Sequence, residues 1–243
     1  PASERIFLQS LNESYGRTEF LGPVDHYFAA NSLIPLAVKP GLLNDDVFAG
    51  AGSDELMFQF YAQEFRDASE AAGGDQGQLV HRQSIVLHRL NLENLLARLD
   101  RSTMQASLEA RVPYTDHHLV EFAFSLPTSL RIDIAPEEAS PFLSASMLDR
   151  RGTLRSKRLI RQVAARRLPF ELANRRKASF PTPVRQWLSG PWENWARDRL
   201  LNSPFARQVF RREALIELTS NVSMAGMWLW PMLNLAMWGD SVL

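Results

Sequence analysis

The 243-residue sequence contains no cysteine, which excludes disulfide bonds, thiolate metal sites and a cysteine nucleophile within these residues. It also lacks an apolar run of about 18 residues, the length that a membrane-spanning helix needs. Neither charge is in excess, with 27 basic and 27 acidic residues. The balanced charge gives no reason to expect nucleic acid or an anionic membrane as a partner. The composition is that of a globular domain, and the absence of cysteine is compatible with the cytoplasm, where we expect the protein.

Apolar periodicity predicts a chain dominated by helices. Helical spacing covers residues 23–37, 55–72, 79–100, 117–125, 156–167, 184–188, 192–201, 213–218 and 227–239. Residues 46–49 are the one convincing strand candidate, nearly continuous in apolar character and flanked by helices. That pattern is typical of a strand buried on both faces of a parallel sheet, whose other strands would have to come from outside these residues. Residues 134–152 are predicted to form a surface insertion.

A glycine-rich turn follows the predicted strand and contains Gly50, Gly52, Ser53 and Asp54. Backbone N–H groups at such a strand-to-helix turn favour a phosphate or pyrophosphate. The carboxylate of Asp54 could hold Mg²⁺, which prefers carboxylate and phosphate oxygens. The alternative is a tight structural turn in which Asp54 compensates the helix dipole. Spacing alone leaves both interpretations open.

Two further groups of cations invite a functional interpretation. Residues 174–183 contain three consecutive cations ending at Lys177, followed by a proline-locked segment that could clamp a phosphate. A solvated basic turn is the alternative. Arg111 could bind a substrate carboxylate or phosphate through its two-pronged guanidinium, or it could pair with Glu109 or Asp100 and hold its loop.

The segment from Asp100 to Ala123 reads Asp-Arg-x-x-Met and then Ser-Leu-Glu-x-Arg-Val-Pro-Tyr-x-Asp. It resembles the signature of the asparagine synthetase family, and the resemblance extends unevenly from Val24 to Trp238. That family joins a carboxylate to an amine through an acyl-adenylate. The resemblance implies an α/β fold, of which residues 1–243 would be the C-terminal, mostly helical part of the synthetase domain. The whole domain would be an adenine-nucleotide alpha-hydrolase-like (ATP pyrophosphatase) domain, with its parallel sheet completed by other sequence or a partner chain.

The resemblance also implies roles for individual residues. The family carries Ser-Gly-(Glu/Asp)-Gly-x-Asp-Glu where this chain has its glycine-rich turn, which puts Gly50, Gly52 and Ser53 beside the ATP pyrophosphate and Asp54 on its Mg²⁺. The lysine of the family's Arg-x-Lys-x-Gly-Phe segment corresponds to Lys177, and implies contact with pyrophosphate and stabilisation of charge during amine attack.

Other matches are less definite. Arg111 and Asp100 fall in the part of the family that lines the substrate cleft, although Asp100 could equally belong to a buried structural pair. Ala51 replaces the family's acidic residue, which puts ordinary asparagine formation in doubt.

Two parts of a complete asparagine synthetase are not found in these residues. One is the glutaminase domain with its leading cysteine, and the other is the Ser-Gly-Gly-x-Asp-Ser loop that grips the ATP pyrophosphate. The resemblance therefore implies a second chain that carries both. It also implies ATP and Mg²⁺, a small-molecule carboxylate, and ammonia or an amine donor. Two alternatives stay open: a lactam-forming or other specialised natural-product amide synthetase, and a catalytically degenerate scaffold subunit.

Overall fold

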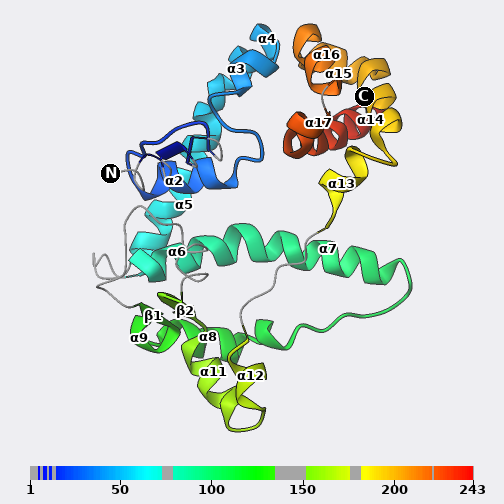
Figure 1. Ribbon diagram of the computed structural model, residues 1–243. Coiled ribbons are helices and arrows are strands. Elements are labelled where there is room, and N and C mark those ends of the chain that lie inside the picture. Colours follow the sequence, from blue (N-terminus) through cyan, green and yellow to red (C-terminus); the bar gives the residue numbers. More distant parts are fainter. Residues whose placement is uncertain are drawn as a thin grey trace. The chain divides into compact units, whose positions relative to one another are not determined.

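A computed structural model (Figure 1) describes positions 5, 8, 9, 11 and 12 and residues 15–72, 79–134, 152–175, 182–220 and 222–242. The chain divides into two compact units. The first unit comprises residues 1–62 and 179–243, and the second comprises residues 63–178. The two ends of the sequence therefore belong to one unit, and the middle forms the other.

The N-terminal half of the first unit is built from short helices. They are α2 (Pro23–Asn31), α3 (Lys39–Leu42), α4 (Asp45–Gly50), the 3₁₀ turn η1 (Gly52–Asp54) and the start of α5 (Glu55–Ala71). The helix predicted over residues 23–37 ends early, at Asn31. Pro35 accounts for this end, because a proline pushes the residue before it, here Ile34, out of the helical region.

The strand predicted at residues 46–49 is wrong, since these residues lie in α4. The helix closes with hydrogen bonds from the Phe48 N–H to the Asn44 carbonyl (2.9 Å) and from the Ala51 N–H to the Val47 carbonyl (3.0 Å). A helix satisfies its backbone groups locally, whereas a strand needs neighbouring strands. Asp45 and Asp46 in the first turn also favour the helix through its dipole. Residues 46–49 therefore need no strands from outside this chain.

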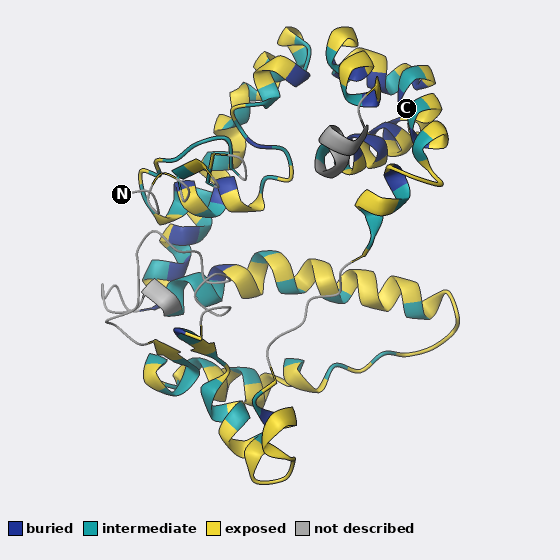
Figure 2. Cartoon of the chain, viewed as in Figure 1, coloured by how far each residue is buried: buried dark blue, intermediate teal, exposed yellow. Residues whose placement is uncertain are grey.

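A helical bundle forms the C-terminal half of the first unit. Its helices are α13 (Val184–Leu188), α14 (Glu193–Asn202), α15 (Pro204–Val209), α16 (Arg212–Ser220) and α17 (Val222–Val242). The long α17 packs on the other four, and Figure 2 shows buried residues concentrated along it. Leu229, Met232 and Leu233 of α17 are fully buried with Leu188 and Leu200. Burial of such side chains is the main source of stability for the bundle.

A seam of hydrogen bonds joins residues 40–45 to residues 207–211 within this unit. Leu43 and Phe210 form an isolated antiparallel bridge. The Asn44 N–H donates to the Val209 carbonyl (3.0 Å), and the Arg211 N–H donates to the Leu42 carbonyl (2.9 Å). The Arg211 side chain adds hydrogen bonds to the Pro40 and Leu43 carbonyls and an ion pair with Asp45. This seam ties α3 to the C-terminal bundle.

The second unit is organised around one long helical rod, visible in Figure 1. The helix predicted over residues 79–100 is confirmed as α6 (Leu79–Leu87), a π-helical turn η3 (His88–Leu92) and α7 (Glu93–Met104). The remaining elements are η4 (Pro113–Thr115), α8 (His117–Ser125), α9 (Thr128–Arg131), β1 (Ile132–Ile134), β2 (Leu154–Ser156), α11 (Arg158–Ala165) and α12 (Phe170–Ala173). Asp116 caps α8, since its Oδ1 accepts from the Leu119 N–H at 3.2 Å.

Among the described residues, the only sheet is the antiparallel pair β1–β2, in which Ile132 lies opposite Ser156 and Ile134 opposite Leu154. The described part of the chain is therefore mostly helical with one small sheet. The two strands bracket the predicted insertion, of which residues 135–151 lie outside the described residues. None of the helices within the described ranges has the length and apolar character required to cross a membrane.

Candidate functional site

The glycine-rich turn keeps an unusual backbone conformation in the structure. Gly52 (φ 65°), Ser53 (φ 50°) and Asp54 (φ 73°) are three consecutive residues in the left-handed region. Glycine adopts this region freely, whereas serine and aspartate do so at a cost in conformational energy. Gly50 ends α4, and the turn leads directly into α5. The turn thus places Ser53 and Asp54 at the N-terminal end of a 17-residue helix, a position that favours negatively charged groups.

Asp54 is not a free carboxylate, because the Lys39 ammonium lies 2.7 Å from its Oδ1. Both side chains are 20 % exposed, so the pair is largely shielded from solvent. The Lys39 Nζ also lies 5.7 Å from the centre of the Phe28 ring, within the range of a cation–π contact. Lys39 is therefore a residue of the candidate site that sequence reasoning missed. Its separation of 15 positions from Asp54 gives no periodic signal in the sequence.

Ser53 and Asp54 line a cavity of about 400 Å³ in the first unit. A second ion pair lines the same cavity, between Arg17 Nη1 and Asp25 Oδ1 at 2.6 Å. The Asp25 side chain is only 7 % exposed, and its Oδ2 accepts from the Leu21 N–H at 3.0 Å. Both oxygens of Asp25 therefore have donors. The charged residues that line the cavity are the cation Arg17 and the carboxylates Asp25, Asp54 and Glu55.

Two tyrosines lie beside this region on α2 and α5. The rings of Tyr27 and Tyr61 pack edge to face with their centres 5.4 Å apart. Burial raises the pKa of Tyr61, and burial together with the neighbouring Tyr61 phenol raises the pKa of Tyr27. Both phenols therefore stay protonated at neutral pH and serve as neutral packing groups.

Asp100 and Arg111 both belong to the second unit. Asp100 lies on α7 and is exposed, so the buried structural pair considered for it does not form. Arg111 Nη2 pairs with Glu109 Oε1 at 2.6 Å, the local pairing that the sequence left open. The two side chains are 85 % and 67 % exposed, and such a pair is held weakly in water. Arg111 is therefore available to a substrate at little cost.

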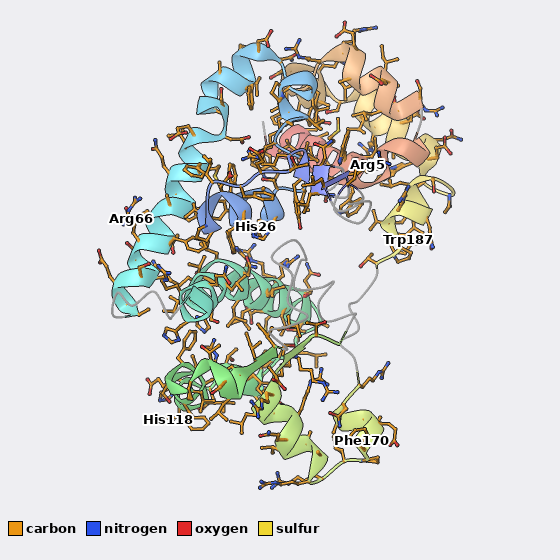
Figure 3. All side chains as sticks on the ribbon, turned by 60° about the vertical axis from the view of Figure 1, so that its left-hand side comes forward. Arg5, His26, Arg66, His118, Phe170 and Trp187 are labelled. Atoms are coloured by element: carbon orange, nitrogen blue, oxygen red, sulfur yellow. The ribbon has the colours of Figure 1, made fainter. Side chains whose placement is uncertain are left out.

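Lys177 lies outside the described residues, so its predicted role carries no structural account. Within the basic segment, residues 176–181 lie outside the described residues. The Arg161 Nη1 of α11 donates to the Arg175 carbonyl at 2.9 Å and to the Ala173 carbonyl at 3.3 Å. These bonds hold Ala173 and the start of the basic segment against α11. Figure 3 shows the side chains, with Phe170 at the start of α12 in the second unit and Trp187 on α13 in the first.

The turn could supply only some of the ligands that a Mg²⁺ ion bound to pyrophosphate requires. Within the described residues, no three histidine or acidic side chains converge as a metal cluster. Mg²⁺ is commonly held by one or two carboxylates together with phosphate oxygens, so Asp54 suffices as the protein's share. Of the predicted site residues, the structure brings together Gly50, Gly52, Ser53 and Asp54 in the first unit, while Asp100 and Arg111 belong to the second.

Parts of the chain are similar in sequence to asparagine synthetases and to an amidase. The segment matched to asparagine synthetase [glutamine-hydrolyzing] 1 of Bacillus subtilis (strain 168) is 29 % identical over 121 residues, which is 50 % of this chain and 16 % of that protein. A putative asparagine synthetase [glutamine-hydrolyzing] 1 of Methanocaldococcus jannaschii is 33 % identical over 103 residues, 41 % of this chain and 18 % of that protein. Amidase chyE of Penicillium rubens is 29 % identical over 92 residues, 38 % of this chain and 12 % of that protein. The matched segments thus span less than a fifth of these relatives.

No solved structure matches the chain. The model of the asparagine synthase family matches residues 20–240, which covers most of the sequence and includes every predicted site residue. The chain belongs to the asparagine synthase family.

Proposed function

We propose that the chain is part of an ATP-dependent amide-forming enzyme. The complete enzyme would adenylate a carboxylate, releasing pyrophosphate, and ammonia or an amine would then displace AMP from the acyl carbon. The observation that carries this proposal is the family match across residues 20–240. The turn before α5 supports it, because its backbone and Asp54 have the character of a phosphate and metal site.

The roles of the phosphate-binding residues follow from their chemistry. Gly50, Gly52 and Ser53 would bring backbone N–H groups close to the ATP phosphates, and Asp54 would hold Mg²⁺. When bound, Mg²⁺ would neutralise part of the charge on pyrophosphate. Lys177 would hold the pyrophosphate and stabilise the negative charge that develops on the tetrahedral intermediate.

The second unit would contribute substrate contacts. Arg111 would exchange its exposed pairing with Glu109 for a substrate carboxylate, and Asp100 would help to place the substrate. Exposure of both side chains supports this role, since neither must leave a buried partner to reach a ligand.

We also propose a second polypeptide, or a further segment of the same protein, that supplies the glutaminase domain and the pyrophosphate loop. Neither motif occurs in these 243 residues. The protein is expected to act in the cytoplasm, in biosynthesis.

A second candidate function keeps the chemistry and changes the substrates. Ala51 removes the carboxylate that the family carries between the two glycines, and in the structure Ala51 is exposed at the end of α4. A methyl group cannot act as a base or bind an amine at that point. This substitution favours a specialised synthetase that closes a lactam or amidates another acid. It equally favours a scaffold subunit without ATP chemistry.

Reconstitution distinguishes these functions. The isolated chain should bind ATP–Mg²⁺ more weakly than micromolar by calorimetry and should not hydrolyse glutamine. A complex with a polypeptide that carries a Ser-Gly-Gly-x-Asp-Ser loop should exchange labelled pyrophosphate into ATP in the presence of the correct carboxylic acid. Micromolar ATP binding by the isolated chain would contradict the need for a partner. A stable complex that exchanges no pyrophosphate with any of a broad panel of acids would identify a scaffold.

A further inference from the structure

We propose that Lys39 is a positioning residue that keeps Asp54 from binding a free divalent cation and releases it to a cation that arrives with a phosphate. The inference rests on the proposed function, because it takes Asp54 as the metal-binding carboxylate. It adds a residue to the site and a preference for the metal–phosphate complex over the free metal.

Lys39 is held in place from several sides. Its ammonium is 2.7 Å from Asp54 Oδ1 and 5.7 Å from the centre of the Phe28 ring, and Phe28 is only 6 % exposed. Its backbone begins α3, which also contains the buried Leu42 and is joined to the C-terminal bundle through the seam. The anchored helix and the contact with Phe28 keep the Lys39 ammonium within reach of Asp54.

Asp25, another carboxylate of the cavity, cannot take over the role of Asp54. Asp25 receives Arg17 Nη1 on one oxygen and the Leu21 N–H on the other, and its side chain is 7 % exposed. Freeing Asp25 would leave a backbone donor and a guanidinium without partners in a nearly buried place. Asp54 Oδ1 instead accepts from the Lys39 ammonium, which can turn toward a phosphate and so release the carboxylate.

A bare dication would compete directly with Lys39. Mg²⁺ binds carboxylate oxygens at about 2.0–2.1 Å, so it would lie close to the ammonium that now contacts the same oxygen. Two positive charges at that separation repel each other, and solvent screens them little because both side chains are mostly covered. Binding of free Mg²⁺ is therefore disfavoured for two reasons. Lys39 already occupies the Asp54 oxygen, and its positive charge repels the ion.

A phosphate removes this conflict. Its oxygens accept hydrogen bonds from an ammonium and also bind the metal, so Lys39 would move from Asp54 to the phosphate while the metal takes Asp54. The two ligands then bind with positive coupling, since each provides the charge that the other requires. The turn would consequently bind a metal–phosphate complex more tightly than the metal alone.

The experiment compares Mn²⁺ binding by water-proton relaxation enhancement in three single variants of the chain. Lys39→Met removes the ammonium and keeps an apolar side chain against Phe28. Lys157→Met is the matched control, because it removes the same charge from an exposed lysine of the second unit. Asp54→Asn removes the proposed metal ligand. Circular dichroism checks that each variant keeps the wild-type helix content.

The expected result is that Lys39→Met binds free Mn²⁺ at least tenfold more tightly than the wild type, while Lys157→Met does not. Titration with preformed Mn²⁺–pyrophosphate gives the affinity for the complex, which is divided by the affinity for free Mn²⁺. This ratio should be at least tenfold higher for the wild type than for Lys39→Met. Unchanged free-Mn²⁺ affinity in Lys39→Met, or no binding by either protein, would overturn the role of Lys39.

Asp54→Asn separates this inference from the proposed function. If Asp54→Asn weakens Mn²⁺–pyrophosphate binding but Lys39→Met behaves as wild type, Asp54 is the metal ligand and the inference on Lys39 fails alone. If Asp54→Asn leaves binding of both probes unchanged, the proposed metal site itself is wrong, and with it the inference.

Discussion

Replacing Gly239 with alanine should destabilise the C-terminal bundle of the first unit. An added Cβ at Gly239 of α17 would lie 2.2 Å from Cγ and 2.4 Å from Cδ1 of the Phe205 ring. The backbone that carries the ring is held in place, because the Phe205 N–H donates to Oδ1 of Asp240, the next residue of α17, at 3.0 Å. Asp240 also accepts from the buried Ser203 hydroxyl at 2.9 Å. The start of α15 is thus fixed to the helix that would carry the new methyl group.

The magnitude follows from two opposing effects. Overpacking of this kind costs about 1–3 kcal/mol, whereas alanine gains up to about 1 kcal/mol over glycine in a helix interior. We expect a net loss of about 1–2 kcal/mol in the free energy of unfolding. Phe205 is partly exposed, so the ring can shift outward to some extent, which keeps the loss from exceeding this range.

Urea denaturation followed by tryptophan fluorescence measures this loss. Gly41→Ala in α3 is the matched control, because its Cβ would meet no heavy atom within 4 Å and should leave stability unchanged or slightly raised. Adding Phe205→Ala to Gly239→Ala should cost less than the sum of the two single variants, since the clash is then removed. A Gly239→Ala protein as stable as wild type, or additive costs in the double variant, would refute the close packing of α15 on α17.

Three further outcomes are expected. Ser53→Val should lower stability by about 1 kcal/mol or more, because a β-branched side chain disfavours the positive φ of 50°; Ser53→Gly should be tolerated in the same denaturation assay, and equal stabilities would contradict the left-handed turn. The part of the stability that depends on the neutral Tyr27 phenol should be fully present below about pH 10 and be lost above it, because the raised pKa of Tyr27 keeps its phenol protonated in the folded state at a pH where the unfolded chain loses that proton; Tyr27→Phe should make this alkaline fall shallower in pH-dependent melts, and an unchanged fall would exclude Tyr27 as its source. In the reconstituted enzyme, Lys177→Ala should reduce kcat by roughly two to three orders of magnitude with a smaller change in KM; turnover within a few-fold of wild type would assign Lys177 to a solvated turn.

The sequence predicted the long helices well, because their apolar residues recur at the helical period and so mark one face of each helix. The helices at residues 55–72 and 79–100 are confirmed. The strand at residues 46–49 is wrong, because a short apolar run does not distinguish a buried strand from a helical turn. The strands that do form, β1 and β2, carry mixed polar and apolar residues over three positions each, too few for a period of two to appear.

The residues of the candidate site were likewise identified only in part from the sequence. The sequence identified the glycine-rich turn, because glycine spacing directly reflects backbone conformation, and Gly52 does adopt a positive φ. It could not identify Lys39 or the Arg17–Asp25 pair, because these contacts depend on how short helices fold back on one another. The assignments of Asp54, Lys177, Arg111 and Asp100 to substrate chemistry stay predictions.

The seam between residues 40–45 and 207–211 also sets the order in which the protein can fold during synthesis. Its hydrogen bonds join groups 163 to 171 positions apart. At a synthesis rate of about 5–20 residues per second, the second half of the seam is made roughly ten to thirty seconds after the first half. The seam cannot form before then. During that interval Leu42 has no bundle to pack against, and α3, which carries Lys39, has no anchor. The Lys39–Asp54 pair therefore becomes fixed only after the second unit and α15 have been made, so the candidate site matures among the last parts of the chain.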